Sequence, residues 1–237
     1  MSDQEASKQP SPAPAQALAT ALAERCRDQI KTTLGVEVGL ESASLAFLDH
    51  YLRTLRDEQR PEVLALVAAQ TGAWFGELIR SEIGATWIGD GKQPRRLRLL
   101  LEPAFVHLSP IDMAYEAIFG VPVEDSDARL PDGATLDPGF HLRKRPPRPL
   151  QDGDGEQDGD GEQDGEQDAE QGQSDHDWVA DRLAEVPPLP VDQFHSLTGR
   201  FETLEFILQL VLTRSLARGE TPTRYHLNDY VAELTND

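Results

Sequence analysis

Cysteine is scarce in this sequence, since Cys26 is the single thiol among 237 residues. One cysteine excludes an internal disulfide and the zinc sites that several cysteines build. Cys26 also falls on the apolar stripe of a predicted helix, which favours a buried structural thiol over a catalytic nucleophile. The chain therefore fits a reducing compartment.

Long apolar runs are lacking as well. The most apolar stretch, Leu204 to Leu212, is interrupted by Glu205 and Gln209 and is far too short to span a bilayer. The first residues carry neither the basic segment nor the apolar segment of a secretory signal peptide. These absences predict a cytoplasmic protein that does not enter a membrane.

Lysine and arginine are absent from residues 150–177, which hold 12 acidic residues. Without this segment the formal net charge would change from −20 to −8. The segment has too little apolar surface to offset the entropy lost on ordering, so we expect a disordered linker. Because so acidic a chain repels phosphates and anionic lipids, we expect no nucleic-acid partner and no membrane partner.

Helical periodicity dominates the first part of the remainder. Residues 1–13 are polar and proline-rich, and we expect a disordered tail there. Residues 15–34 repeat apolar side chains at i, i+4 and end at Gly35, which is typical of a helix with a glycine C-cap. A second helix is predicted after Ser42 or Ser44, with apolar positions as far as Leu55. Pro61 begins a third, over residues 61–83.

The pattern changes after Gly84. Residues 85–88 and 96–101 are predicted to be two strands joined by a Gly-Asp-Gly turn, and residues 104–108 a third strand. Ser109 and Pro110 begin a short helix that ends at Gly120. Residues 14–120 are therefore predicted to form an α+β domain, mainly helical, with a small antiparallel sheet of two or three strands.

Residues 121–177 are predicted to be a linker, first proline-rich and then acidic, and residues 178–237 a separate C-terminal helical unit. Its long helix, from Val191 to just before Gly219, is apolar on more than one side and must be covered from several directions. A unit of about 60 residues is too small to supply that cover. We expect it to dock on the N-terminal domain or on a second copy of the chain.

Two glycines, Gly72 and Gly76, lie one turn apart on the predicted third helix. Each costs about 1 kcal/mol relative to alanine in a helix, so we expect a neighbour that needs a surface without side chains. Close approach of another helix is one interpretation. The other is a groove for a ligand or a partner, formed by these glycines with Glu77 and Trp87.

The same region carries a recognisable pattern of residues. Its matching positions are Ser42-Ala43-Ser44-Leu45, Leu48-Asp49, Thr71 to Arg80, Gly84 and Trp87. This pattern resembles uncharacterised bacterial domains in which a Gly-Ala-aromatic-x-Gly-Glu helix leads into a Trp-bearing strand. The resemblance covers residues 15–120, and Ser109-Pro110 stands where such domains often have Asn-Pro. It implies a small cytoplasmic α+β domain of unknown function, with no established catalytic residues.

Metal sites and catalytic motifs are not evident in the sequence. The acidic run has the composition of a calcium loop, but counted from Asp152 its sixth and twelfth positions are Gln157 and Gln163 instead of glycine and an acid. No two histidines lie at i, i+4 on one helix, so we expect no specific metal and no cofactor. Glu77 could form an acid/base pair with His107 or Glu102 only if the fold brings them together.

Basic residues cluster at two places, Arg95 to Arg98 and Arg143 to Arg148. One interpretation is an anionic partner. The other is intramolecular, with the acidic run pairing with the basic cluster that directly precedes it.

We interpret the chain as a non-enzymatic protein–protein interaction or adaptor protein that binds a protein partner or self-associates. The candidate anchors, each of which could instead belong to the core, are Trp74, Phe75, Phe201 and Phe206. Two alternatives stay open. One is a small enzyme or ligand-binding domain with its pocket near Glu77 and Trp87, and the other is a component or cargo of a larger bacterial assembly.

Overall fold

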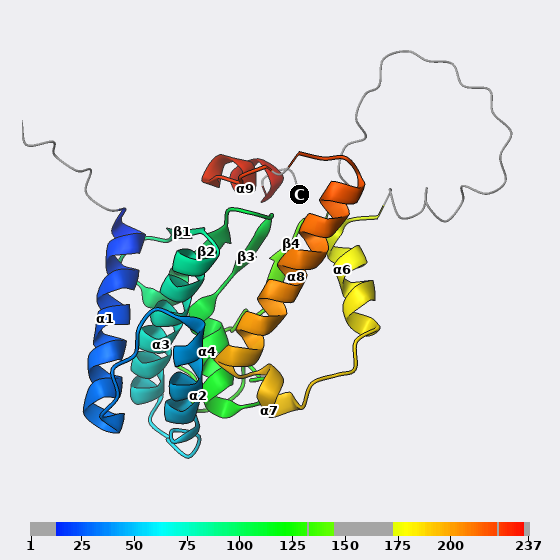
Figure 1. Cartoon of the computed structure of the whole chain (residues 1–237). Helices are drawn as coiled ribbons and strands as arrows, with labels where there is room; N and C mark the ends of the chain where they lie inside the picture. The colour runs from blue at the N-terminus through cyan, green and yellow to red at the C-terminus, as the bar shows by residue number, and fades with distance from the viewer. Residues whose placement is uncertain (1–12, 132, 145–172, 222, 235–237) are drawn as a thin grey trace, which may run out of the picture.

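A computed structural model describes residues 13–131, 133–144, 173–221 and 223–234, which form an α+β fold (Figure 1). The described helices are α1 (Pro14–Leu34), α2 (Leu45–Arg53), α3 (Pro61–Glu82), α4 (Pro110–Phe119), α6 (Asp175–Ala184), α7 (Val191–Phe194), α8 (Leu197–Ala217) and α9 (Leu227–Leu234). The strands are β1 (Ala85–Ile88), β2 (Arg98–Leu101), β3 (Val106–Leu108) and β4 (Phe140–Leu142). Two short 3-10 helices are η1 (Ser42–Ser44) and η2 (Pro94–Arg96).

Helix α1 packs along α3 through small and apolar side chains, among them Ala19, Cys26 and Ile30. It ends where the sequence predicts, because Gly35 adopts the left-handed conformation (φ 70°) and its N–H bonds to the carbonyl of Lys31. The structure also confirms the third predicted helix, since α3 covers all but the last of the predicted residues 61–83.

Helix α2 differs from its prediction at both ends. Neither Ser42 nor Ser44 makes a side-chain cap, because η1 occupies residues 42–44 and leads directly into α2. At the other end the helix stops at Arg53, so Leu55 lies in a turn outside the helix.

The sheet is antiparallel throughout, with strands in the order β1-β2-β3-β4. Its first three strands lie where the sequence predicts, but the link from β1 to β2 includes η2 and is longer than a tight hairpin turn. The prediction of two or three strands was wrong by one strand. Strand β4 comes from residues assigned to the linker, where three residues are too few to show an alternating pattern.

Helix α4 lies at the centre of the molecule, against α2, α3 and α8, and each of its residues is buried. Ser109 caps its first turn as predicted, since its Oγ accepts the N–H of Asp112 at 3.4 Å. Gly120 ends it with a φ of 72°. A helix buried on every side needs cover from several elements, and these come from both halves of the chain.

Residues assigned to the first part of the predicted linker belong to the fold. Leu130, Ala134 and Leu142 are buried in the main core, and β4 pairs with β3. The α+β region thus continues at least to residue 144. Residues 145–172, with most of the acidic run, lie outside the described part of the chain.

The predicted long C-terminal helix is two helices in the structure. A break at His195 and Ser196 separates α7 from α8, and the Ser196 Oγ caps α8 by accepting the N–H of Gly199 at 3.0 Å. A Cβ on Gly199 would lie 2.1 Å from the carbonyl oxygen of Gln193. Only glycine therefore fits so close to α7.

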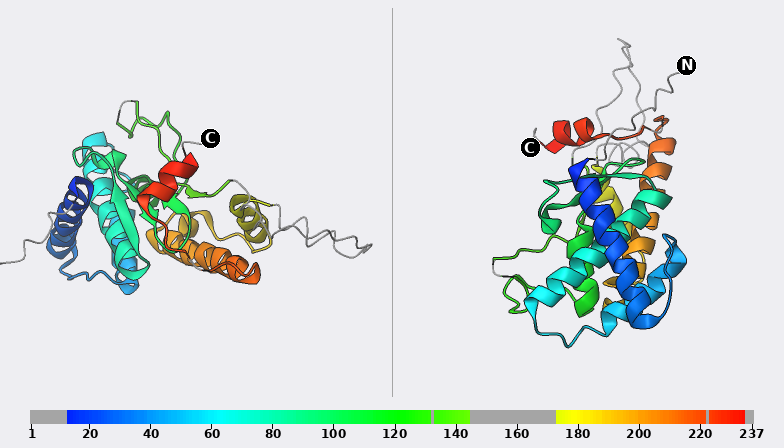
Figure 2. Two further views of the ribbon diagram at one scale, coloured as in Figure 1. Left: turned by 90° about the horizontal axis from the view of Figure 1, so that it is seen from above. Right: turned by 90° about the vertical axis from the view of Figure 1, so that its left-hand side faces the viewer.

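Helix α8 docks on the N-terminal helices, as one of the two predicted alternatives requires. It contacts α2 and α4, and the Phe201 ring meets the Phe75 ring edge-on at 6.5 Å between centroids. Its buried residues belong to the same core as α1, α3 and α4, so α8 does not have a separate core. Figure 2 shows α8 and α6 on the side of the molecule opposite α1.

Helix α9 differs from the rest, because it lies across the sheet at the far end of α8 from α7 (Figure 1). It begins at Leu227 and ends at Leu234. Of the described helices, none is long and apolar enough to cross a membrane.

Candidate functional site

The groove predicted at Gly72 and Gly76 is filled by the chain itself. A Cβ on Gly72 would lie 2.5 Å from the Cα of Ile111, and a Cβ on Gly76 would lie 2.2 Å from the ring of Trp87. Helix α4 and β1 therefore approach α3 at its two glycines. This is the packing interpretation of the glycine pair.

Glu77 and Trp87 do come together, but as a closed polar cluster. The buried Glu77 carboxylate accepts hydrogen bonds from Trp87 Nε1 at 2.7 Å, Gln16 Nε2 at 2.8 Å and the Arg80 guanidinium at 3.0 and 3.2 Å. Four N–H donors satisfy the charge that burial would otherwise penalise. The cluster ties α1, α3 and β1 together. Neither His107 nor Glu102 is among these partners.

Three of the four predicted anchors are core residues. Trp74 and Phe75 are fully buried on α3 and Phe201 is 3% exposed on α8. Phe206 differs, because it is half-buried on α8. A partner could reach Phe206 alone without unfolding the helices.

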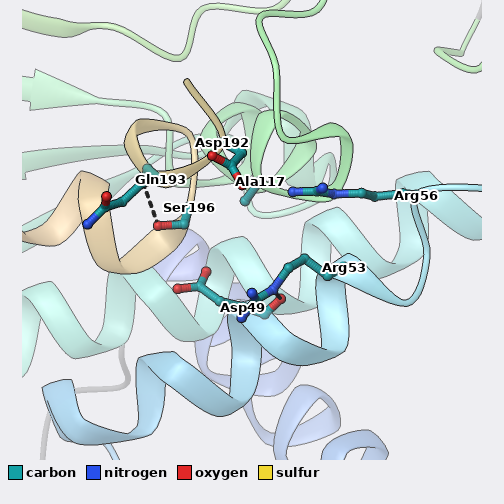
Figure 3. A pocket seen from close by; sticks show the side chains of 7 residues that line it. All are labelled: Asp49, Arg53, Arg56, Ala117, Asp192, Gln193 and Ser196. Atoms are coloured by element: carbon teal, nitrogen blue, oxygen red, sulfur yellow. Dashed lines mark hydrogen bonds between the residues drawn. The ribbon is translucent and has the colours of Figure 1, made fainter. Parts of the chain in front are cut away.

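A pocket of about 210 Å³ opens instead at the end of the molecule where α2, α4 and α7 meet (Figure 3). Helix α2 and the turn after it supply Asp49, Arg53 and Arg56, and α4 supplies Ala117. The lining residues on the side of α7 are Asp192, Gln193 and Ser196. The pocket thus lies between the N-terminal helices and the C-terminal segment that docks on them.

Asp49 at the base of the pocket is already engaged with α8. Its Oδ1 accepts the N–H of Leu197 at 2.8 Å, and its Oδ2 accepts the N–H of Thr198 at 3.1 Å and the Thr198 hydroxyl at 2.5 Å. The first amides of a helix have no partners within the helix, and they favour negative charge. The charge of Asp49 is therefore compensated by α8 and is not available to a ligand.

The arginines are compensated less completely. Arg53 is exposed and its Nε donates to the main-chain oxygen of Asp49 at 3.1 Å. Arg56 reaches across the pocket toward Ala117 (Figure 3), and its Nε is buried with no hydrogen-bond acceptor among the described residues. Within that part of the chain, no carboxylate forms an ion pair with either guanidinium. Both positive charges therefore lack an ion pair, although the Asp192 carboxylate lines the same pocket.

A buried polar triad of Glu116, His195 and Arg200 lies next to the pocket. The Glu116 carboxylate on α4 lies 2.8 Å from His195 Nδ1 and also binds the Arg200 guanidinium of α8. All three side chains are less than a tenth exposed. The Arg200 guanidinium stacks over the Phe194 ring at 4.4 Å. The triad holds the end of α7 and the start of α8 to α4, and so fixes the wall that Gln193 and Ser196 provide.

The polar groups of the pocket do not form a catalytic arrangement. The Ser196 hydroxyl donates to the carbonyl of Gln193 at 2.7 Å while it caps α8, so its proton is engaged with a main-chain carbonyl and not with a general base. Among the described residues no group of three or more His, Cys, Asp or Glu side chains could hold a metal ion. Cys26 lies elsewhere in the core, where burial raises the pKa of its thiol to about 12.

Exposed apolar side chains stand beside these charged groups. Val121 directly follows Gly120, on which the Arg56 guanidinium packs, and it is 46% exposed. Leu189 and Val191 precede Asp192 and are also exposed. Arginines in the pocket, with exposed apolar side chains close to lining residues in the chain, suit a ligand that combines a carboxylate with aliphatic groups.

Sequence spacing predicts only a small part of this site. Arg53 and Arg56 lie three residues apart at the end of the second predicted helix, a spacing that puts both on one side of a helix. Asp192 and Ser196, however, reach the pocket only because α7 and α8 dock on α4. Sequence spacing could have identified the arginine pair but not the opposite wall.

Comparison with known proteins adds no relative. The chain matches no protein-family model, and no curated protein or solved structure is significantly similar to it.

Proposed function

We propose that the chain is a non-enzymatic protein–protein interaction or adaptor protein whose pocket at α2, α4 and α7 binds a carboxylate-bearing segment of a partner protein. One observation carries the proposal: Arg53 and Arg56 line a pocket without forming an ion pair, since the Asp49 carboxylate is fully engaged with α8 and the Asp192 carboxylate in the lining pairs with neither guanidinium. A guanidinium fork matches a carboxylate in shape and charge.

The net negative charge of the chain favours a protein ligand over a polyanion, because it repels a polyanion. The formal net charge of −20 repels nucleic acids and anionic membranes. A peptide with a single carboxylate meets little of that repulsion, and its aliphatic neighbours would contact Val121 and Val191. The preferred ligand is therefore a short aliphatic segment with one acidic side chain or a free C-terminus.

The cellular compartment is part of the same proposal. We place it in the cytoplasm, because the single cysteine is a buried free thiol. Membership in the bacterial domains that residues 15–120 resemble stays a proposal as well.

The test uses a panel of fluorescent aliphatic peptides with one carboxylate, each paired with its amide counterpart, and measures binding by polarisation. We expect the carboxylate peptides to bind and their amides to bind at least tenfold more weakly. Arg56→Gln should weaken binding by about tenfold, since a hydrogen bond to a charged group contributes about 1.5–3 kcal/mol. Arg56→Lys should recover part of the affinity, because it keeps the charge but not the fork.

The control is Arg25→Gln, which removes the same charge from an exposed position on α1. It should leave binding unchanged, and melting curves should show that all variants are folded. Equal affinity for acid and amide peptides, equal loss in the Arg25 variant, or no binding by any peptide would overturn the proposal.

A further inference from the structure

The outer face of the sheet binds one side chain of α9, that of Tyr230, at a site formed by Leu100, Phe105 and the main chain of residues 101–106. We call this site the socket. Tyr230 is 1% exposed, and its ring stacks on that of Phe105 at 4.2 Å between centroids. Its hydroxyl accepts the N–H of Val106 at 2.9 Å and lies 2.8–3.1 Å from three carbonyl oxygens, those of Leu101, Ala104 and Val106.

The segment leading to α9 adds contacts of matching charge. The Tyr225 N–H donates to the main-chain oxygen of Glu102 at 2.8 Å, and the Arg224 guanidinium binds the Glu102 carboxylate. Near the other end of α9, Glu233 lies 3.8 Å from Arg143. We call residues 223–234 the strap.

The strap has its own small core. Leu100, Phe105 and Tyr230 form a cluster of buried residues that is separate from the main core, joined by the half-buried Ile88 and Tyr225. Along β2, Leu99 and Leu101 point into the main core whereas Leu100 points to the strap. Removal of the strap therefore takes no side chain out of the main core.

The strap is joined to α8 by a short connection, which we call the tether. Between Ala217 and Leu227 the described residues form no helix or strand, and Gly219 has a positive φ of 71°. The five residues between Ala217 and the strap can span up to roughly 18 Å when extended. Such a connection permits the same segment to close on its own sheet or on that of a neighbour.

Exposed apolar side chains lie at both ends of the tether. Leu216 at the end of α8 is 63% exposed and Leu227 at the start of α9 is 47% exposed. In a closed single chain these side chains face water. Two tethers that cross between copies would bring these leucines together and cover them.

We propose that the sheet face under the strap is a docking surface for the strap of a second copy, so that the chain forms a dimer by strap exchange. The second copy is the occupant because it carries the tyrosine, the Arg224 charge and the tether that this surface fits. The α2, α4 and α7 pocket lies at the opposite end of the molecule and stays open in such a dimer (Figure 1). The inference goes beyond the proposed function and does not depend on it.

A charge exchange between two full-length variants tests the proposal. In Arg224→Glu the strap and its own socket both carry glutamate, and in Glu102→Arg both carry arginine, so each variant repels its own strap. In a mixed exchanged dimer both straps meet an opposite charge again. We expect native mass spectrometry of the mixture to show a mixed dimer severalfold more abundant than the dimer of either variant alone.

Three controls make the result decisive. The chain that carries both substitutions restores the pair internally and should behave as the wild type, which we expect to dimerise increasingly with concentration. Adding Tyr230→Ala to both variants should abolish the mixed dimer, while circular dichroism shows that the helices remain. A wild type that stays monomeric at all concentrations, no mixed dimer, or a mixed dimer that survives Tyr230→Ala would overturn strap exchange.

Discussion

At the scale of single residues, buried charges in this protein act as ties between elements. Glu77 joins α1, α3 and β1, Asp49 joins α2 to α8, and Glu116 joins α4 to both His195 and Arg200. Each carboxylate receives donors from elements distant in sequence. Removing one partner would leave a buried charge without compensation, which costs more than the pair contributes.

His107 should make the stability of the fold depend on pH. It stacks on His141 at 4.6 Å and faces Tyr230, Arg98 and Asp137, and burial, with a smaller effect of His141, lowers its pKa from 6.5 to about 4. Between pH 6.5 and 4 the His107 imidazole is protonated in the unfolded chain but stays neutral in the folded chain. The fold therefore loses stability as pH falls through this window, by roughly 2 kcal/mol after allowance for partial exposure.

Urea unfolding at several pH values from 7 to 4 measures this loss. In His107→Gln the free energy of unfolding should fall less over the same range. Parallel pH profiles for the wild type and the variant would show that His107 is not the group responsible.

At the scale of elements, the sequence predicts most helices but not their partners. Gly35, Gly120 and Ser109 are local signals, and the helices they end or begin lie where predicted. Strand β4 has no such signal, and the Ser196 cap lies within a continuous helical pattern of apolar residues. Each depends on contacts across the fold, of Asp49 with α8 and of β3 with β4. Local propensity cannot encode these distant contacts.

The α3–α4 contact predicts the effect of a single methyl group. In Gly72→Ala the new Cβ would meet the main chain of Pro110 and Ile111 at 2.5–2.8 Å, and main chain cannot move aside as a flexible side chain can. We expect a loss of about 1–3 kcal/mol in unfolding free energy, despite the better helix propensity of alanine. Gln70→Ala, on the same helix but only half-buried, should change it little. A Gly72 variant as stable as the wild type in urea would refute this account of the glycine pair.

At the scale of the whole molecule, one core unites segments on both sides of the undescribed residues 145–172. The sequence predicted that α8 needs cover from other elements, and it left open whether that cover comes from the same chain. In the structure α2, α3 and α4 cover α8. The pocket exists only because of this docking, and so its second wall could not be predicted from the sequence.

The shared core predicts that the C-terminal segment does not fold alone. In an isolated fragment of residues 173–237, Leu197, Phe201 and Leu204 lose the N-terminal side chains that bury them. Its circular dichroism should show a weak, gradual thermal transition, or association. A cooperative transition in a monomeric fragment would contradict the shared core.

The central claim, that the arginine pocket binds a carboxylate, can be observed at the guanidinium itself. In protein labelled with ¹⁵N-arginine, titration with a carboxylate peptide should shift the Nε–H NMR signals of Arg56 and Arg53 and leave that of Arg25 in place. Binding that moves other arginine signals while those of Arg53 and Arg56 stay fixed, or no shift at all, would contradict the account.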